Sequence, residues 1–137
     1  MALPKTDSFT VTVDTDIQDY DANWIRAGGS GWRVYEATDT LACVASGSSP
    51  WIPNLHWEGD TFDANQYAQA KIAALDTGAS YVGVSVRCAS GTTNTHYGWF
   101  GANTEHSLCK MISGSVTWLG DDTTDGYAGE LIRQEVS

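Results

Sequence analysis

Short stretches of alternating apolar and polar residues, separated by glycine-rich turns, constrain the fold of this chain most. In residues 81–90, "YVGVSVRCAS", the residues Val82, Val84 and Val86 point to one side and Gly83 and Ser85 to the other. Fourteen glycines punctuate such stretches at spacings of roughly 8 to 12 residues. No stretch shows a sustained helical period with capping residues. The pattern predicts an all-β sandwich or barrel.

Eight segments carry the strand signal, and two long polar segments separate them. We expect the stretches 66–75 and 81–90 to form a hairpin, because a Gly-containing "DTGAS" turn joins them. Residues 46–56, "SGSSPWIPNLH", and 121–129, "DDTTDGYAG", are expected to be loops. The predicted strands are 9–13, 31–37, 66–75, 81–90, 96–102, 107–113, 115–120 and 130–136.

Length and charge limit the classes of function. The 137 residues indicate a single domain over 1–137, and a net charge of −10 disfavours nucleic acid and anionic membranes as partners. "MALPKTDSFT" has no signal-peptide pattern, and no apolar run approaches the ~20 residues that a membrane span needs. Cys43, Cys88 and Cys109 form no C-x-x-C pair, and their disulfide state stays open.

Five segments occur in the order found in one known fold family. They are "FDANQYAQAKIAAL", "YVGVSVRCAS", "HYGWF", "LCKMISGSVTWLG" and "GELIRQEVS", over residues 62–137, and "ANWIRAGGSGWRVYEATD" fits the family's opening pattern. Together they resemble the concanavalin A-like, laminin-G-like jelly-roll family, in its non-catalytic branch. The resemblance implies an antiparallel jelly-roll sandwich that lacks its last strands. It leaves three alternatives: a reduced sandwich, a fragment, or strands supplied by another chain.

The string "HWEGDTFD", residues 56–63, raises the question of glycoside hydrolysis. Retaining glycosidases use paired carboxylates, and laminarinase-type members of the fold carry E-x-D-x-x-E on a strand. Here Glu58, Asp60 and Asp63 form E-G-D-T-F-D, whose last acid is one methylene too short and whose Gly59 weakens a strand. We therefore expect a solvated turn with Phe62 in the core, and no enzyme.

Two acidic clusters are candidate calcium sites, because Ca²⁺ takes six to eight oxygen ligands from carboxylates and carbonyls. The first is "DTDIQDYD", with Asp14, Asp16, Asp19 and Asp21, and the alternative for both clusters is a set of solvated acids. Relatives of the resembled fold often bind calcium at loop ends. The second, which we take as the candidate metal site, comprises Asp121, Asp122 and Asp125.

Aromatic side chains are candidate sugar platforms. Tyr97 and Trp99 share one face of their strand, and Tyr81, Ser85 and Arg87 would complete an aromatic and charged patch if they lined that face. Trp51, in the proline-rich loop, is a further candidate. The alternative, which we favour for Trp32, Trp99 and Trp118, is packing in the core or at an edge.

The expected function is that of a non-catalytic structural or decorating subunit. The larger assembly would be a bacteriophage virion, as a capsid decoration or a tail adhesin, with glycan binding as an added ability. Partners would be other protein chains of that assembly, and the location a virion or an extracellular surface. One alternative is a carbohydrate-binding module of a secreted enzyme or adhesin. Another is a small glycoside hydrolase using Glu58 with Asp60 or Asp63.

Overall fold

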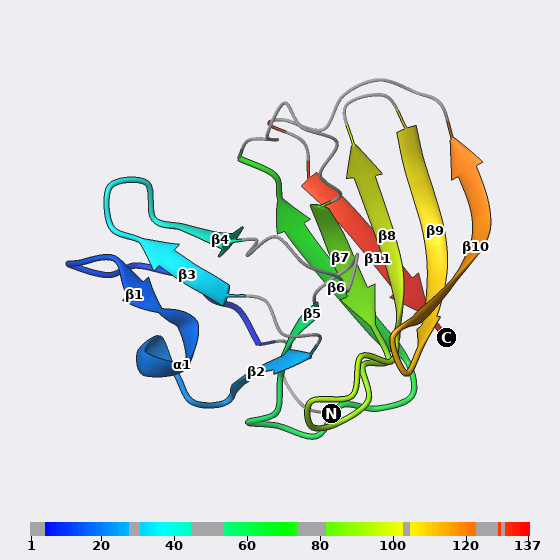
Figure 1. Ribbon diagram of the computed structural model, residues 1–137, viewed down its shortest axis with the longest axis horizontal. Coiled ribbons are helices and arrows are strands. Elements are labelled where there is room, and N and C mark those ends of the chain that lie inside the picture. The colour runs from blue at the N-terminus through cyan, green and yellow to red at the C-terminus, as the bar shows by residue number, and fades with distance from the viewer. Residues whose placement is uncertain are drawn as a thin grey trace. The chain divides into compact units, whose positions relative to one another are not determined.

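In the part of the chain that the structure describes, the regular secondary structure is strand except for one four-residue helix, and every strand pair is antiparallel (Figure 1). The computed structural model describes residues 5–27, 31–44, 54–73, 82–102, 105–122, 129 and 131–137. This confirms the all-β prediction, whereas the jelly-roll connection stays a prediction. The elements are β1 (Thr15–Asp16), α1 (Ile17–Tyr20), β2 (Trp24–Ala27), β3 (Gly31–Tyr35), β4 (Thr40–Val44), β5 (Asn54–Trp57), β6 (Gln66–Lys71), β7 (Val82–Val86), β8 (His96–Ala102), β9 (Glu105–Ile112), β10 (Ser115–Asp122) and β11 (Leu131–Val136).

The chain divides into two compact units. Unit 1 comprises Met1–Asp63 with Ser90–Thr93, and unit 2 comprises Ala64–Ala89 with Asn94–Ser137. The expectation of one sandwich domain over residues 1–137 stays a prediction.

Unit 1 contains two small sheets and the four-residue helix. β3 pairs with both β1 and β4, and β2 pairs with β5. The apolar side chains of Ile17, Ala27 and Val34 are at most 1% exposed, so the helix, β2 and β3 each bury one of them. This apolar contact stabilises short elements that would not persist alone.

Unit 2 contains a four-stranded sheet in the order β10-β9-β8-β7 and a two-stranded pair, β11-β6. Ser113 and Gly114 form the tight turn between β9 and β10, with φ values of 46° and 81°. Positive φ at both central residues is typical of the two-residue hairpin turn whose twist matches the strands. The "SGS" signal at 113–115 is confirmed as a turn.

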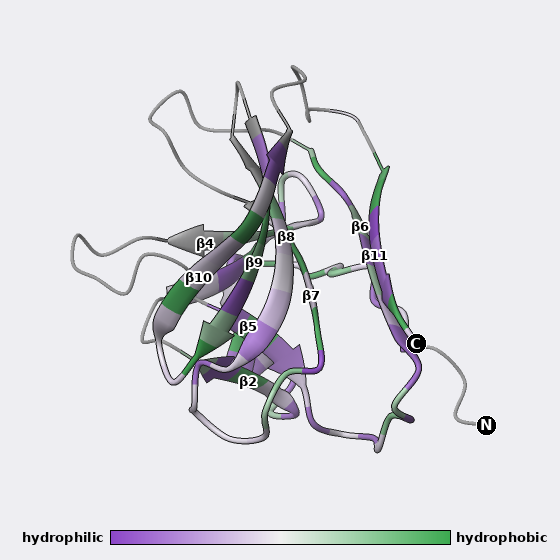
Figure 2. Ribbon diagram, turned by 90° about the vertical axis from the view of Figure 1, so that its right-hand side faces the viewer, coloured by the Kyte–Doolittle hydropathy of each residue, from purple (hydrophilic) through white to green (hydrophobic). Residues whose placement is uncertain are grey.

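The β6–β11 pair packs face to face against β7. Its core consists of Ile72, Val84 and Ile132, each at most 7% exposed, with Ala68 and Ala70 packed beside them. Figure 2 shows this pair as a separate layer from the four-stranded sheet. Unit 2 therefore has the layered packing of a β-sandwich, in which side chains of two sheets form the core.

Three predictions from the sequence are wrong, one of them only at its end. Residues 9–13 form no strand, because Phe9 has a φ of 52° and its N–H is held by the carboxylate of Asp7. The segments 66–75 and 81–90 form no hairpin. β6 pairs with β11 instead, and its Ala68 and Ala70 pack against the core that includes Val84 of β7. The expected loop 46–56 is wrong at its end, because β5 begins at Asn54, and its residues 46–53 lie outside the described residues.

Candidate functional site

Glu58, the first acid of the candidate catalytic string, is held in place at the end of β5. Its carboxylate accepts hydrogen bonds from the Gly91 N–H and from His56 Nε2, the latter at 3.1 Å. Its own N–H donates to the Asn23 carbonyl at 2.9 Å. The Gly91 bond first, and the His56 bond second, lower the pKa of Glu58 below its ordinary value. A carboxyl group with a lowered pKa is a poor general acid, because it is ionised at working pH.

Asp60 and Asp63 have different surroundings from Glu58. Asp60 accepts a hydrogen bond from the indole N–H of Trp57 at 2.9 Å, and Asp63 is exposed. Phe62 is 40% exposed, so the expectation that it enters the core is wrong. These contacts favour the interpretation of the string as an ordered, acidic turn. Its carboxylates hold the backbone and an indole in place.

Among the described residues of unit 1, an aromatic cluster surrounds the carboxylate of Asp7, and sequence reasoning missed it. Asp7 accepts hydrogen bonds from the Phe9 N–H at 2.9 Å, the Tyr20 hydroxyl at 2.5 Å and the Trp24 indole at 3.3 Å. The bond to Asp7, followed by burial, raises the pKa of Tyr20 to about 12. Asp7 thus ties the segment before β1 to α1 and β2.

The rings of this cluster contact one another and a cation. Phe9 lies 5.7 Å from Trp24 and Trp24 lies 5.4 Å from Trp57, between ring centroids, the second pair edge to face. The Lys5 ammonium lies 3.8 Å from the Trp57 centroid, a cation–π contact. A Cβ on Gly59 would lie 2.4 Å from the same indole. The Trp57 ring is thus used for packing within the chain, which makes it a poor sugar platform.

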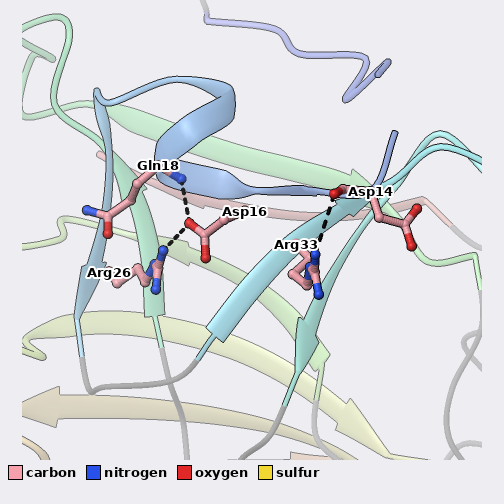
Figure 3. Close-up of polar contacts among 5 residues, drawn as sticks. All are labelled: Asp14, Asp16, Gln18, Arg26 and Arg33. Atoms are coloured by element: carbon pink, nitrogen blue, oxygen red, sulfur yellow. Dashed lines mark hydrogen bonds and ion pairs between the residues drawn. The ribbon is translucent and has the colours of Figure 1, made fainter. Parts of the chain in front are cut away.

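The acidic segment 14–21 contains β1 and α1, and its Asp14 and Asp16 accept hydrogen bonds within the chain (Figure 3). Asp16 caps α1 by accepting the Gln18 N–H at 3.0 Å, and it also pairs with the Arg26 guanidinium. Asp14 accepts the Arg33 side chain through its carbonyl and the Glu36 N–H through its carboxylate. Asp capping is a common use of such a residue. The segment is better explained by these contacts than by calcium.

The second acidic cluster is described only in part. Asp121 accepts a hydrogen bond from the Ser107 hydroxyl at 2.7 Å. The side chain of Asp122 and all of Asp125 lie outside the described residues. Within the described part of the chain, no group of three or more His, Cys, Asp or Glu side chains gathers to hold a metal ion. The metal assignment to Asp121, Asp122 and Asp125 stays a prediction.

The face of β8 that carries Tyr97 and Trp99 is flanked on β7 by other residues than expected. Tyr97 and Trp99 do share a face, but the register places them opposite Val86 and Val84. Directly opposed residues share a face, so Ser85, opposite Gly98, lies on the other side. The expectation that Ser85 lines the Tyr97 face is therefore wrong. The register of β7 with β8 places Val84 and Val86, not Ser85, on the face of Tyr97 and Trp99.

The remaining sugar candidates are not brought to Tyr97 by the contacts of the described residues. Arg87, after the end of β7, donates its N–H to Gln66 at 2.9 Å and its guanidinium to the Ala64 carbonyl at 3.4 Å. Trp99 meets His106 edge to face, with ring centroids 6.0 Å apart. Tyr81 and Trp51, the other two sugar candidates, lie outside the described residues.

Comparisons with known proteins add no family to these observations. No protein-family model, no curated protein and no solved structure matches the chain. The resemblance to the concanavalin A-like family thus stays a prediction from the sequence segments. In the described part of the chain, no helix has the length and apolar character needed to cross a membrane.

Proposed function

We propose that this protein is a non-catalytic structural β-sandwich subunit that binds other protein chains in a larger assembly. A bacteriophage virion is the context that we propose, because the resembled lectin fold and the acidic composition both suit it. In this role the chain supplies a folded surface, and no side chain needs to perform chemistry.

The observation that carries the proposal is that, among the described residues of unit 2, part of one face of the four-stranded sheet stays exposed. The β6–β11 pair packs on β7, where it buries Val84. The same face continues over β8 and β9, where Tyr97 is 37% exposed and Ile112 is 49% exposed. A sandwich normally covers such a face with a second sheet. An assembly partner would bury these side chains in the same way.

The contacts of two acids in the candidate catalytic string support a structural role. Glu58 is ionised and engaged with Gly91 and His56, while Asp60 is engaged with the Trp57 indole. A retaining hydrolase instead needs a protonated acid about 5–5.5 Å from a second carboxylate. The observed contacts explain these acids without a reaction.

The proposal is tested by the native mass of the untagged protein and of a Tyr97→Ser variant, measured by light scattering. We expect the wild type to form a particle heavier than the 14.7 kDa chain and Tyr97→Ser to weaken it. Tyr67→Ser is the matched control, because Tyr67 is 43% exposed but lies on the β6–β11 pair. A wild type that stays monomeric would contradict the proposal.

Glycan binding is a second candidate, supported by the shared exposed face of Tyr97 and Trp99. Lys110 lies directly opposite Tyr97 on this face, so an ammonium is available beside the aromatic pair. A glycan array with wild type, Trp99→Ala and Trp51→Ala tests it. Binding that Trp99→Ala abolishes would support this site, and an array without signal would refute it.

A further inference from the structure

We propose that β10 pairs edge to edge with β10 of a second copy of this chain, in antiparallel orientation and centred on Thr117. This inference rests on the proposed function and names its partner. It makes the protein a two-fold dimer, or a dimeric unit of a larger assembly, through an isologous interface.

The outer edge of β10 is available for pairing. Among the residues that the structure describes, β10 is hydrogen-bonded to β9 on one side and to no strand on the other. In Figure 1 it forms the outermost strand of its sheet. Unpaired strand edges are templates for pairing with another chain, and proteins protect them with Lys, Pro or a bulge. Ser115–Trp118 contains neither Lys nor Pro, and the bulge of β10 lies beyond this stretch, at Leu119.

The side chains of β10 are apolar at this edge. Val116 is 38% exposed and Trp118 is 44% exposed. They lie opposite Met111 and Cys109, which are buried, so they extend the buried apolar face of the sheet to its border. Burying the exposed parts of these side chains would favour association.

The sequence Val116-Thr117-Trp118 is self-complementary in an antiparallel pair. Centring on Thr117 places Val116 opposite Trp118 of the second copy, twice, and Thr117 opposite its own equivalent. Aromatic–β-branched pairs and Thr–Thr pairs are among the stabilising cross-strand combinations. This symmetry argues for a second copy rather than for an unrelated strand.

The charges of β10 favour the same arrangement. The acids of this strand, Asp121 and Asp122, stand at its C-terminal end. An antiparallel pair keeps them away from their equivalents, whereas a parallel pair would place like charges side by side. The neutral stretch from Ser113 to Gly120 thus lets two copies of a chain with net charge −10 approach each other.

A β-bulge sets the length of the pairing. The register with β9 shifts between Trp118 and Gly120, so Leu119 is the extra residue. Bulges disrupt the ladder locally and bend the strand. The regular edge therefore spans Ser115–Trp118, and the interface we infer is short, as expected for one contact within a larger assembly.

The experiment compares Thr117→Glu with the matched charge control Thr61→Glu by light scattering over a concentration series. Thr117 is exposed and lies opposite Lys110 on β9. The introduced carboxylate would therefore lie beside an ammonium group of its own chain, and we expect the variant to fold. In the dimer it would face its own equivalent. We expect the dimer dissociation constant to rise about ten-fold or more for Thr117→Glu and to stay unchanged for Thr61→Glu.

A second variant tests the register directly. In Thr117→Cys, the two introduced thiols face each other across the symmetry axis, and mild oxidation should yield a covalent dimer. Thr61→Cys and the wild type, which has three cysteines, give the background. The inference is supported if Thr117→Glu weakens dimerisation and oxidised Thr117→Cys forms a covalent dimer. An assembled wild type that neither variant alters overturns the inference alone. A wild type that is monomeric at every concentration overturns both the inference and the proposed function.

Discussion

Gly83 in β7 lies closer to the backbone of the neighbouring strand β8 than any side chain allows. A Cβ added there would lie 1.9 Å from the Trp99 carbonyl oxygen and 2.7 Å from the Phe100 Cα, both backbone atoms of β8. Contacts under 3.0 Å essentially never occur for a real Cβ, so β7 and β8 would have to separate by about an ångström. No side-chain rotation can relieve a clash with backbone.

We expect Gly83→Ala to lower the free energy of unfolding by about 2 kcal/mol or more. Overpacking costs about 1–3 kcal/mol, and more when backbone must move, while removing a strand glycine returns only about 0.5–1 kcal/mol. This corresponds to a fall of about 8 °C in the thermal midpoint, which differential scanning fluorimetry measures.

Gly120→Ala is the matched control, because a Cβ at Gly120 in β10 meets nothing within 4 Å and the residue has no positive φ. It should be neutral or slightly stabilising. A Gly83→Ala protein with the midpoint of the wild type, or of Gly120→Ala, would refute the described packing of β7 on β8.

Three further predictions concern pH and the core. The pKa of Glu58 is lowered in the folded state, so its carboxylate stabilises the fold above the ordinary pKa of 4.5, and this stabilisation is lost as pH falls through the folded pKa. The thermal midpoints of wild type and Glu58→Gln should therefore differ most at neutral pH and converge in acid. The Tyr20 phenol should ionise with a pKa of about 12, so its stabilising hydrogen bond to Asp7 is present below the ordinary pKa of 10.0 and is lost as pH rises through the folded pKa. An ultraviolet titration of the tyrosines measures this late step. A Tyr20→Phe protein that shows the same late step would contradict the assignment. Ile132→Ala should lower the free energy of unfolding in denaturant by about 2–4 kcal/mol, whereas Leu131→Ala, at a residue 66% exposed, should change it by less than about 0.5 kcal/mol; equal losses would contradict the assigned core.

The strands of unit 2 could be predicted because their alternation is long and regular. Val84 and Val86 are buried as the pattern indicated, and β8, β9, β10 and β11 begin and end within two residues of the expected bounds. Pairing was less predictable. The alternation of β6 indicates which side chains face inward but not which strand hydrogen-bonds to it, and here that strand is β11.

Unit 1 was harder to predict, because polar contacts between distant residues determine its structure. The alternating stretch 9–13 indicated a strand, but the Asp7 carboxylate binds Phe9, Tyr20 and Trp24 and imposes another backbone path. The helix α1 has four residues, too few for a periodic signal. Asp16 directly before Ile17 was the one available sign of its start.

The candidate site divides in the same way. The sequence correctly indicated that Tyr97 and Trp99 share a face, since one strand's alternation fixes that. It could not indicate the register between β7 and β8, which separates Ser85 from them. The sequence indicated an acidic turn at Glu58 and Asp60 but not what these side chains bind. The Glu58 carboxylate accepts the N–H of Gly91, which is distant in the sequence, and Asp60 accepts the Trp57 indole N–H.

The native mass of the untagged wild-type protein, measured by light scattering from low to high concentration, shows whether the protein is a subunit of an assembly. We expect a defined particle heavier than a single 14.7 kDa chain, formed reversibly as concentration rises. A mass of one chain at every concentration would contradict the claim that this sandwich is a subunit completed by contacts with other chains.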